Sequence, residues 1–189
     1  MKKYILISAK LTLVFIILCC VIYPLILSGV GKLTPGKGKG ETLVVDGKVV
    51  GYANVGQKFD KDIYFWGRPS AVNYNAAGSG GSNKGPSNPD YLKDVQTKID
   101  TFLTHHPGVK KEDIPAELVT CSGSGLDPDL SPAAVKIQIR RVAAARRMSE
   151  VVLTELIEKQ TERPFLGLFG PSKVNVLKLN IALDKLNKS

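Results

Sequence analysis

A glycine-rich segment, residues 78–85 (GSGGSNKG), is the first candidate for chemistry, because clustered glycines expose backbone N–H groups that can bind phosphate. Its spacing differs from that of a nucleotide-binding loop. A P-loop would need glycine at position 83 and serine or threonine at position 85, whereas the chain has Asn83 and Gly85. No apolar strand leads into the segment, and Asn83 also breaks the dinucleotide-binding pattern. We therefore expect a rigid, hydrogen-bonded loop and not a nucleotide site.

A second candidate, residues 121–125 (CSGSG), resembles the turn that carries a nucleophilic serine in many hydrolases. That motif requires glycine two positions before the nucleophile, and Ser122 stands there instead. The two histidines, His105 and His106, are adjacent and are predicted to close a helix, where an imidazolium interacts favourably with the helix dipole. Neither feature indicates a catalytic site.

Asp127 and Asp129 could be read as a paired acid and base. We interpret them as residues beside the turn before a helix that starts at Ser131, stabilised by its positive N-terminus. After residue 30 the chain has one cysteine, Cys121, so that part has no recognisable zinc ligand set and cannot form an intramolecular disulfide. The sequence predicts no directly bound cofactor and no metal.

The elements that would position these residues begin with an uncharged stretch, residues 11–30, whose 20 positions reach about 30 Å as a helix. This predicts a transmembrane helix; a cleaved signal peptide is the alternative, but no small-residue cleavage site closes the apolar run. Lys2, Lys3, Lys10 and the amino terminus oppose three lysines on the other flank, which favours an N-terminus in the cytoplasm. We predict a cytoplasmic tail (1–10), a span (11–30), a tether (31–40) and an extracytoplasmic domain (41–189).

The expected domain is α+β. Residues 43–50 (LVVDGKVV) predict a β-hairpin, because Asp-Gly is favoured in a type I′ turn. Helices are predicted to start after Asn88, Ser131 and Ser149, each an N-cap residue type, and the second of them is expected to run to about Arg147. Alternating residues 174–182 predict a C-terminal strand. The order is a hairpin, about three helices and a strand.

From residue 31 onward the chain has 23 basic and 17 acidic residues, a net charge of about +6. Such a charge suits an anionic surface or an acidic partner, although an ordinary solvated surface explains it as well. A basic helical face with Lys136, Arg140 and Arg147 suggests a DNA-binding helix-turn-helix. A domain outside the cytoplasm does not meet DNA, so we expect no nucleic-acid partner.

Several blocks of sequence, taken in order, resemble one family, the C subunit of the Kdp-type potassium-transporting P-type ATPase. The blocks are GQKF (56–59), YFWGRPSA (64–71), AGSGGSN (77–83), GPSNP (85–89), SGSGLDP (122–128), RVAAAR (141–146) and VNVLKLN (174–180). The resemblance implies a non-catalytic, single-span subunit of an ATP-driven potassium importer of the bacterial inner membrane. Its implied partners are a channel-like subunit, a P-type ATPase subunit and a small peptide, so that ATP and potassium are handled by the complex.

The resemblance also implies a catalytic chaperone that raises the pump's affinity for ATP. With only about ten residues in the cytoplasm, direct contact between the glycine-rich loop and ATP is excluded, so the effect would pass through the pump's conformation. A free-standing extracytoplasmic binding or sensor module is the alternative. We expect partner contacts or a structural loop at the following residues: Trp66, Arg68, Gly80, Gly81, Ser82, Asn83, Asn88, Ser124 and Asp127. Trp66 and Arg68 are of the types that dominate interface hot spots, but a core tryptophan and a loop-holding arginine are equally compatible with the sequence.

Overall fold

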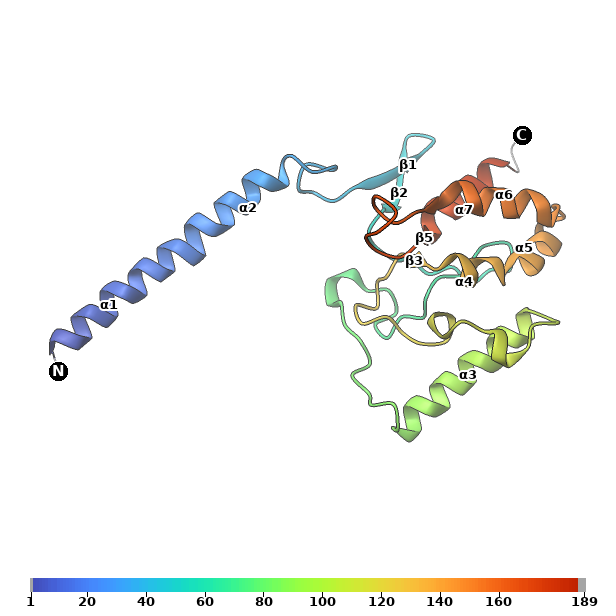
Figure 1. Cartoon of the computed structure of the whole chain (residues 1–189), viewed down its shortest axis with the longest axis horizontal. Helices are drawn as coiled ribbons and strands as arrows, with labels where there is room; N and C mark the ends of the chain where they lie inside the picture. Colours follow the sequence, from blue (N-terminus) through green and yellow to red (C-terminus); the bar gives the residue numbers. More distant parts are fainter. Residues whose placement is uncertain (1, 187–189) are drawn as a thin grey trace. The chain divides into compact units, whose positions relative to one another are not determined.

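The computed structural model describes residues 2–186 and divides the chain into two units, Met1–Thr42 and Leu43–Ser189. The first unit is an N-terminal helix followed by turns, and the second is an α+β domain, as the sequence predicts (Figure 1).

The N-terminal helix is longer than the predicted span. It runs through α1 (Lys2–Ile16), a π-helical segment (Ile17–Ile22) and α2 (Tyr23–Gly31) without interruption. The part from Lys3 to Gly31, 29 residues, is long and apolar enough to cross a bilayer, and none of its side chains is buried. The predicted tail, residues 1–10, is therefore helical from Lys2 onward, while the positions of both flanks relative to a membrane stay predictions.

The predicted hairpin is confirmed. Strands β1 (Thr42–Val45) and β2 (Lys48–Tyr52) pair in a two-stranded sheet. Asp46 and Gly47 between them have φ values of 49° and 76°, as a type I′ turn requires.

The predicted helix starts are also confirmed. Asn88 caps α3 (Pro89–His105) and Ser149 caps α6 (Glu150–Gln160) through side-chain oxygens that accept hydrogen bonds from backbone N–H groups. Ser131 caps α4 (Pro132–Lys136) in the same way. The helix predicted to run from there to Arg147 is interrupted at Ile137 and Gln138, and α5 (Ile139–Arg146) continues beyond the break. Residues 65–88 lie mostly at the surface in an irregular loop with one 3₁₀ turn, η2 (Ala76–Gly78).

The prediction of a strand over residues 174–182 is wrong for most of its length. Strand β5 is confined to Lys173–Asn175, and α7 (Val176–Leu186) follows at once. β5 lies between β3 (Asp129–Leu130) and β4 (Thr161–Glu162) in a three-stranded antiparallel sheet, with Leu130 and Thr161 both opposite Val174. The domain therefore has five α-helices among the described residues, more than the three expected.

The core lies between this small sheet and the helices α4 to α7. Its fully buried side chains include Leu130, Leu153, Ile157, Val174, Leu179 and Leu183. Helix α3 contributes one buried residue, Phe102, and the long loop contributes Phe65. The loop is thus attached to the core at its start, which fixes the position of the residues that follow Phe65 in sequence.

Candidate functional site: paired loops and a buried arginine network

Two loops far apart in sequence lie against each other. The Ser124 carbonyl accepts hydrogen bonds from the Gly80 N–H (2.9 Å) and the Ser79 hydroxyl (3.0 Å). A Cβ atom at Gly81 would lie 3.1 Å from the Gly123 carbonyl oxygen, so a larger residue there would crowd the second loop. We call residues 68–81 and 122–128 the paired loops.

An ion pair closes the paired loops. Arg68 Nη1 lies 3.0 Å from Asp127 Oδ2. The Arg68 side chain is about three-quarters buried, and the Asp127 side chain is about two-thirds buried. The Tyr74 hydroxyl donates to the Arg68 carbonyl at 2.6 Å, which holds the first loop in place. Arg68 therefore binds a carboxylate of the facing loop, in the manner of the loop-holding arginine that the sequence allowed.

The structure brings five of the nine predicted site residues together in the paired loops: Arg68, Gly80, Gly81, Ser124 and Asp127. The other four lie elsewhere. Ser82 and Asn83 are exposed, Asn88 caps α3, and Trp66 lies in a separate network. The glycine-rich segment is thus held by the loop containing Ser124 more than by hydrogen bonds of its own.

The two acidic residues precede the helix that starts at Ser131, as the sequence predicts, and each forms an ion pair. Asp127 pairs with Arg68, and Asp129 forms an ion pair with Lys173 at 2.7 Å. The helix start at Ser131 is capped by Ser131 itself. Each carboxylate thus has a basic partner from another segment, and a further stabilisation of both by that helix N-terminus stays a prediction.

Two side-chain amides hold the start of the long loop. Asn180 of α7 accepts from the Phe65 N–H and donates to the Phe65 carbonyl, both at 2.9 Å. Gln138, at the break between α4 and α5, binds the Trp66 N–H (2.8 Å) and the Trp66 carbonyl (3.1 Å) in the same manner. Both amides are buried, so they satisfy backbone groups that would otherwise be buried without partners.

Arg141 of α5 links this loop to two other segments. Its Nε donates to His106 Nε2 (2.9 Å), its Nη1 to the Asp62 carbonyl (2.7 Å) and its Nη2 to Gln138 Oε1 (2.9 Å). The guanidinium also lies 4.4 Å from the centre of the Trp66 ring, within the range of a cation–π contact. We call Trp66, His106, Gln138 and Arg141 the arginine network.

His106 is neutral in this network. Its Nδ1 lies 2.8 Å from the Phe102 carbonyl and must donate, so its Nε2 is left to accept from Arg141. The pKa of His106 is lowered to about 4, mainly by burial. The hydrogen bond to the Phe102 carbonyl opposes this shift, and the nearby Arg141 cation contributes to it. The prediction that His106 closes a helix is confirmed, because it is the C-cap residue of α3. The predicted imidazolium is wrong for His106, because that side chain is buried, neutral and stacked on Phe102.

We expect acid to destabilise the domain through His106. A pKa lowered from 6.5 to about 4 on folding means that the unfolded chain binds more protons between these values. Stability is therefore fully present above pH 6.5 and is lost as the pH falls toward 4. His106→Gln, which can still accept from Arg141 but does not titrate, should lose less stability over this interval in urea unfolding.

His105→Gln is the matched control, because His105 is the chain's other histidine and its side chain is only partly buried beside Asp62. This variant should keep the steep loss of the unmodified protein. Equal pH profiles for the His106→Gln variant and the unmodified protein would contradict the assignment.

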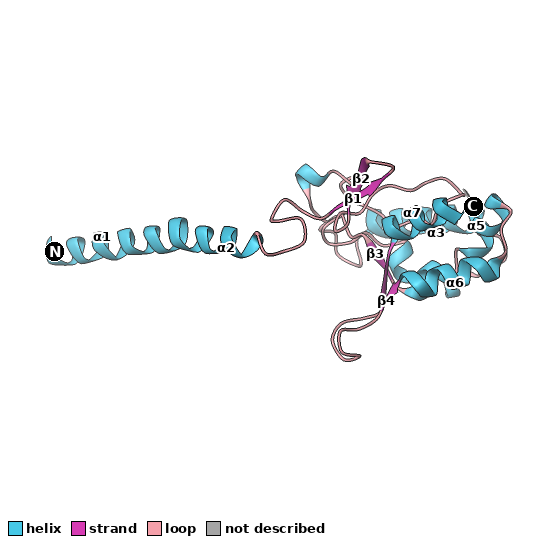
Figure 2. Ribbon diagram, turned by 90° about the horizontal axis from the view of Figure 1, so that it is seen from above, coloured by secondary structure: helices cyan, strands magenta, loops and turns pink. Residues whose placement is uncertain are grey.

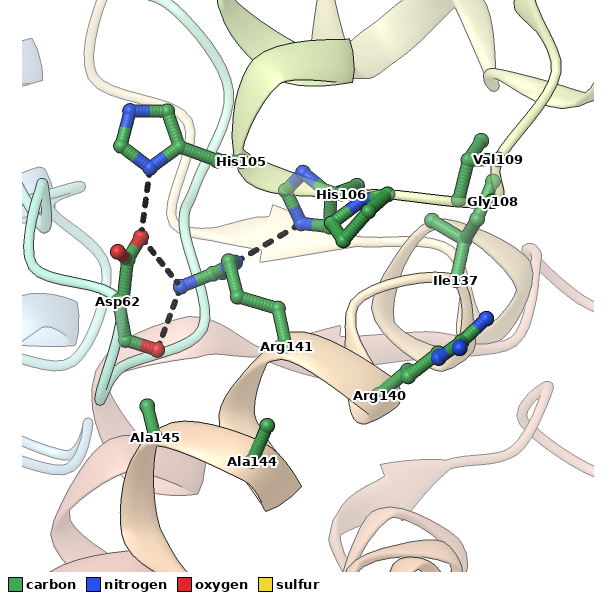
Figure 3. A pocket seen from close by; sticks show the side chains of 11 residues that line it. Asp62, His105, His106, Gly108, Val109, Ile137, Arg140, Arg141, Ala144 and Ala145 are labelled. Atoms are coloured by element: carbon green, nitrogen blue, oxygen red, sulfur yellow. Dashed lines mark hydrogen bonds and ion pairs between the residues drawn. The ribbon is translucent and has the colours of Figure 1, made fainter.

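A cavity of about 600 Å³ lies next to the arginine network. Figure 3 shows Asp62 between His105 and Arg141, with Arg140 directed away from them on the other side. Asp62 Oδ1 is 2.8 Å from His105 Nδ1 and 3.7 Å from Arg141 Nη1. His106 and Gly108 also line the cavity, and its apolar side chains come from Pro107, Val109, Ile137, Ala144 and Ala145.

The side chains at these sites can bind other groups and hold segments of the fold in place. Arg141 already donates to three partners, and burial lowers its pKa to about 10, so it stays protonated at neutral pH. Between residues 2 and 186 no group of three or more His, Cys, Asp or Glu side chains could hold a metal ion.

Known proteins match the chain over nearly its full length. The family model described as KdpC, K⁺-transporting ATPase, c chain, matches residues 5–185. The chain belongs to this family. A KdpC subunit of a potassium-transporting ATPase from Flavobacterium psychrophilum is 58% identical over 177 residues, which are 94% of this chain and 95% of the relative. The corresponding subunits of Bacteroides thetaiotaomicron and Bacillus cereus are 53% and 41% identical over 181 residues, covering at least 94% of both chains in each case.

As a KdpC subunit, the chain is part of a potassium-transporting ATPase, and the family match includes both the N-terminal helix and the domain. Sequence reasoning missed the functions of Gln138, Arg141 and Asn180 within the fold. Arg141 and Asn180 fall inside the blocks RVAAAR and VNVLKLN that carry the family resemblance, so the blocks were a usable signal. Gln138 lies outside them, and only the structure reveals its hydrogen bonds to Trp66.

Proposed function

We propose that this subunit is a non-catalytic accessory component of an ATP-driven potassium importer, anchored in the bacterial inner membrane by its N-terminal helix. The observation that carries the proposal is the nearly full-length family match combined with one apolar helix of spanning length. In this assignment the N-terminus is cytoplasmic and the α+β domain lies outside. The channel-like subunit, the P-type ATPase subunit and the small peptide are its proposed partners.

The proposed effect on ATP affinity is indirect. A domain outside the cytoplasm cannot touch cytoplasmic ATP, so it acts by binding one conformation of the pump more tightly than another. Such coupling requires a rigid domain, because a domain that rearranged freely would not favour either conformation. The amide and arginine contacts that hold Phe65 and Trp66 support this rigidity.

The proposal predicts stoichiometric assembly. When the carboxyl terminus is tagged and membranes from potassium-starved cells are solubilised in mild detergent, a P-type ATPase subunit and a channel-like subunit should co-purify. The apparent ATP affinity of that complex should fall when the accessory subunit is removed. Elution of the subunit alone and folded would favour the second candidate below.

Topology gives an independent test. Ser82 is exposed in the domain, so Ser82→Cys should react from outside intact spheroplasts with a membrane-impermeant maleimide. The three native cysteines, Cys19, Cys20 and Cys121, are replaced by alanine in this variant. Labelling of Ser82→Cys only after the cells are lysed would place the domain inside and would overturn the orientation.

The cavity beside Arg140 favours a second candidate, a free-standing membrane-anchored sensor or binding module. Its volume and its largely apolar lining suit a small ligand. This candidate predicts a stable monomer that binds a ligand without the pump, which the co-purification experiment distinguishes.

A further inference from the structure

A short turn between β4 and β5 presents large apolar side chains to solvent. Residues 164–170 (PFLGLFG), which we call the apolar hairpin, are closed by a single antiparallel bridge between Phe165 and Phe169. Figure 2 shows this segment as a loop that projects beyond β4, away from the helices. The exposed fractions are 72% for Phe165, 75% for Leu166, 80% for Leu168 and 65% for Phe169. Contiguous exposure of this kind marks a contact with another apolar surface.

The backbone of the apolar hairpin satisfies most of its own donors. The Phe165 N–H donates to the Phe169 carbonyl at 2.9 Å, and the Phe169 N–H donates to the Phe165 carbonyl at 3.0 Å. The Gly167 N–H donates to Pro164 (2.9 Å), and the Leu168 N–H donates to Phe165 (3.1 Å). A segment that enters lipid must satisfy its backbone polar groups internally, because hydrocarbon offers them no partner.

One residue of the apolar hairpin adopts a costly conformation. Leu166 has φ 54°, in the left-handed region, which is unfavourable for a residue with a Cβ. Glycine or asparagine would fit there at less cost. Leucine at this position increases the apolar surface at the tip, at the expense of the domain's own stability.

Two basic residues precede the apolar hairpin in sequence, with Glu162 between them. Arg163, directly before it, and Lys159, at the end of α6, are exposed, and neither has an ion-pair partner among the residues that the structure describes. Apolar side chains next to free cations are the composition of segments that lie in the interface of an anionic bilayer.

We propose that the apolar hairpin inserts into the boundary between the headgroups and the acyl chains of the bilayer that holds the chain's own N-terminal helix. The proposal rests on the membrane anchor assigned under the proposed function. Ten residues, 32–41, join α2 to β1, so the tether spans at most about 35 Å when fully extended. The domain therefore stays close to a lipid surface, and a second contact would fix its orientation above the membrane.

A protein partner fits the apolar hairpin less well. Protein interfaces carry about one hydrogen bond per 100–200 Å², and their hot spots pair with pockets on the other side. The four side chains at the tip have no polar atoms, and four of the backbone N–H groups are already used within the turn. A lipid surface requires neither hydrogen-bonding partners nor a complementary shape.

The test uses the full chain in vesicles of phosphatidylethanolamine and phosphatidylglycerol. Leu168→Cys is made without the three native cysteines and labelled with the environment-sensitive dye NBD. Val151→Cys is the matched control, because Val151 on α6 is 66% exposed and apolar. We expect the dye at position 168, and not at 151, to shift its emission to the blue and to lose intensity when the lipid chains carry nitroxide. The assembled complex, reconstituted in the same lipids, should behave in the same way.

Three results would overturn the proposal. An unshifted emission at position 168 in both samples would show that the tip remains in water. A blue shift in the complex without quenching by nitroxide lipid would show that another subunit covers it. Release of the whole chain from vesicles by alkaline carbonate would show that the N-terminal helix does not anchor the chain in the membrane. This result would contradict the proposed function as well, whereas the first two results would contradict this inference alone.

Discussion

Replacing Arg141 by methionine is expected to lower the free energy of unfolding by about 3–5 kcal/mol, because several acceptors lose their donor and each unsatisfied buried group costs about 1–3 kcal/mol. Methionine retains an apolar stem but donates nothing, so His106 Nε2 and the Asp62 carbonyl lose their donor. Gln138 Oε1 also loses the hydrogen bond from Arg141 and keeps only the one from the Trp66 N–H. Urea unfolding of the full chain in mild detergent, followed by the fluorescence of the chain's single tryptophan, measures the change.

Arg140→Met is the matched control, since Arg140 is the neighbouring residue of the same helix and is exposed. A surface substitution of this kind is expected to change stability by no more than about 0.5 kcal/mol. Arg141→Lys separates charge from geometry: it keeps a cation near Trp66 but cannot donate in three fixed directions. Equal unfolding midpoints for the Arg140 and Arg141 methionine variants would show that the arginine network does not stabilise the fold.

The expected loss also bears on the proposed coupling to the pump. Trp66 is half-buried, and its indole N–H donates to the Lys61 carbonyl at 3.1 Å. A contact of Trp66 with a partner subunit stays a prediction, but the ring is already held on one face by Arg141 and on its edges by the two histidines. A displacement of Trp66 would therefore also displace the residues of α3 and α5 that contact its ring.

Local signals in the sequence predicted the starts of elements well. Asn88, Ser131 and Ser149 are caps whose side chains act within three residues, so their effect is readable without the tertiary structure. The Asp46-Gly47 turn is local in the same sense. The N-terminal apolar helix could be predicted from composition alone, because few structures other than a membrane-spanning helix require so long an apolar stretch.

The C-terminal error shows how two periodicities can be confused. Residues 174–182 alternate well enough to suggest a strand, yet Val176, Leu179 and Leu183 also recur at helical spacing and are all buried. Asn175 provided the missing signal. Its side chain accepts from the Lys178 N–H at 3.0 Å, as an N-cap does, so the helix starts directly after β5.

Interactions between segments far apart in the chain could not be predicted from the sequence. Gln138 lies in a stretch whose apolar residues recur at the spacing of one continuous helix. The helix breaks where Gln138 binds Trp66, 72 residues away. The partners of Arg68 and Asp129 are likewise 59 and 44 residues distant. Residue type indicated that these side chains would bind something, whereas the fold determines what they bind.

Gly125→Ala is expected to separate the paired loops. Gly125 has φ 67°, and a Cβ there would lie 2.6 Å from Val72 Cγ2 and 2.8 Å from the Gly80 carbonyl oxygen. The left-handed backbone costs about 1–2 kcal/mol for alanine, and overpacking adds about 1–3 kcal/mol. We therefore expect a loss of about 2–5 kcal/mol in the free energy of unfolding, together with faster tryptic cleavage after Lys84 if the first loop is released.

Gly123→Ala tests whether this loss depends on the contact between the loops. Gly123 lies in the same loop two residues earlier, has no positive φ, and has no atom within 4 Å of the place that an alanine methyl group would occupy. Alanine should be tolerated there, with tryptic cleavage unchanged. If Gly125→Ala behaves like Gly123→Ala, the glycines are not required for loop pairing. If Gly125→Ala alone abolishes co-purification with the ATPase, the joined loops, closed by Arg68 and Asp127, are needed for assembly.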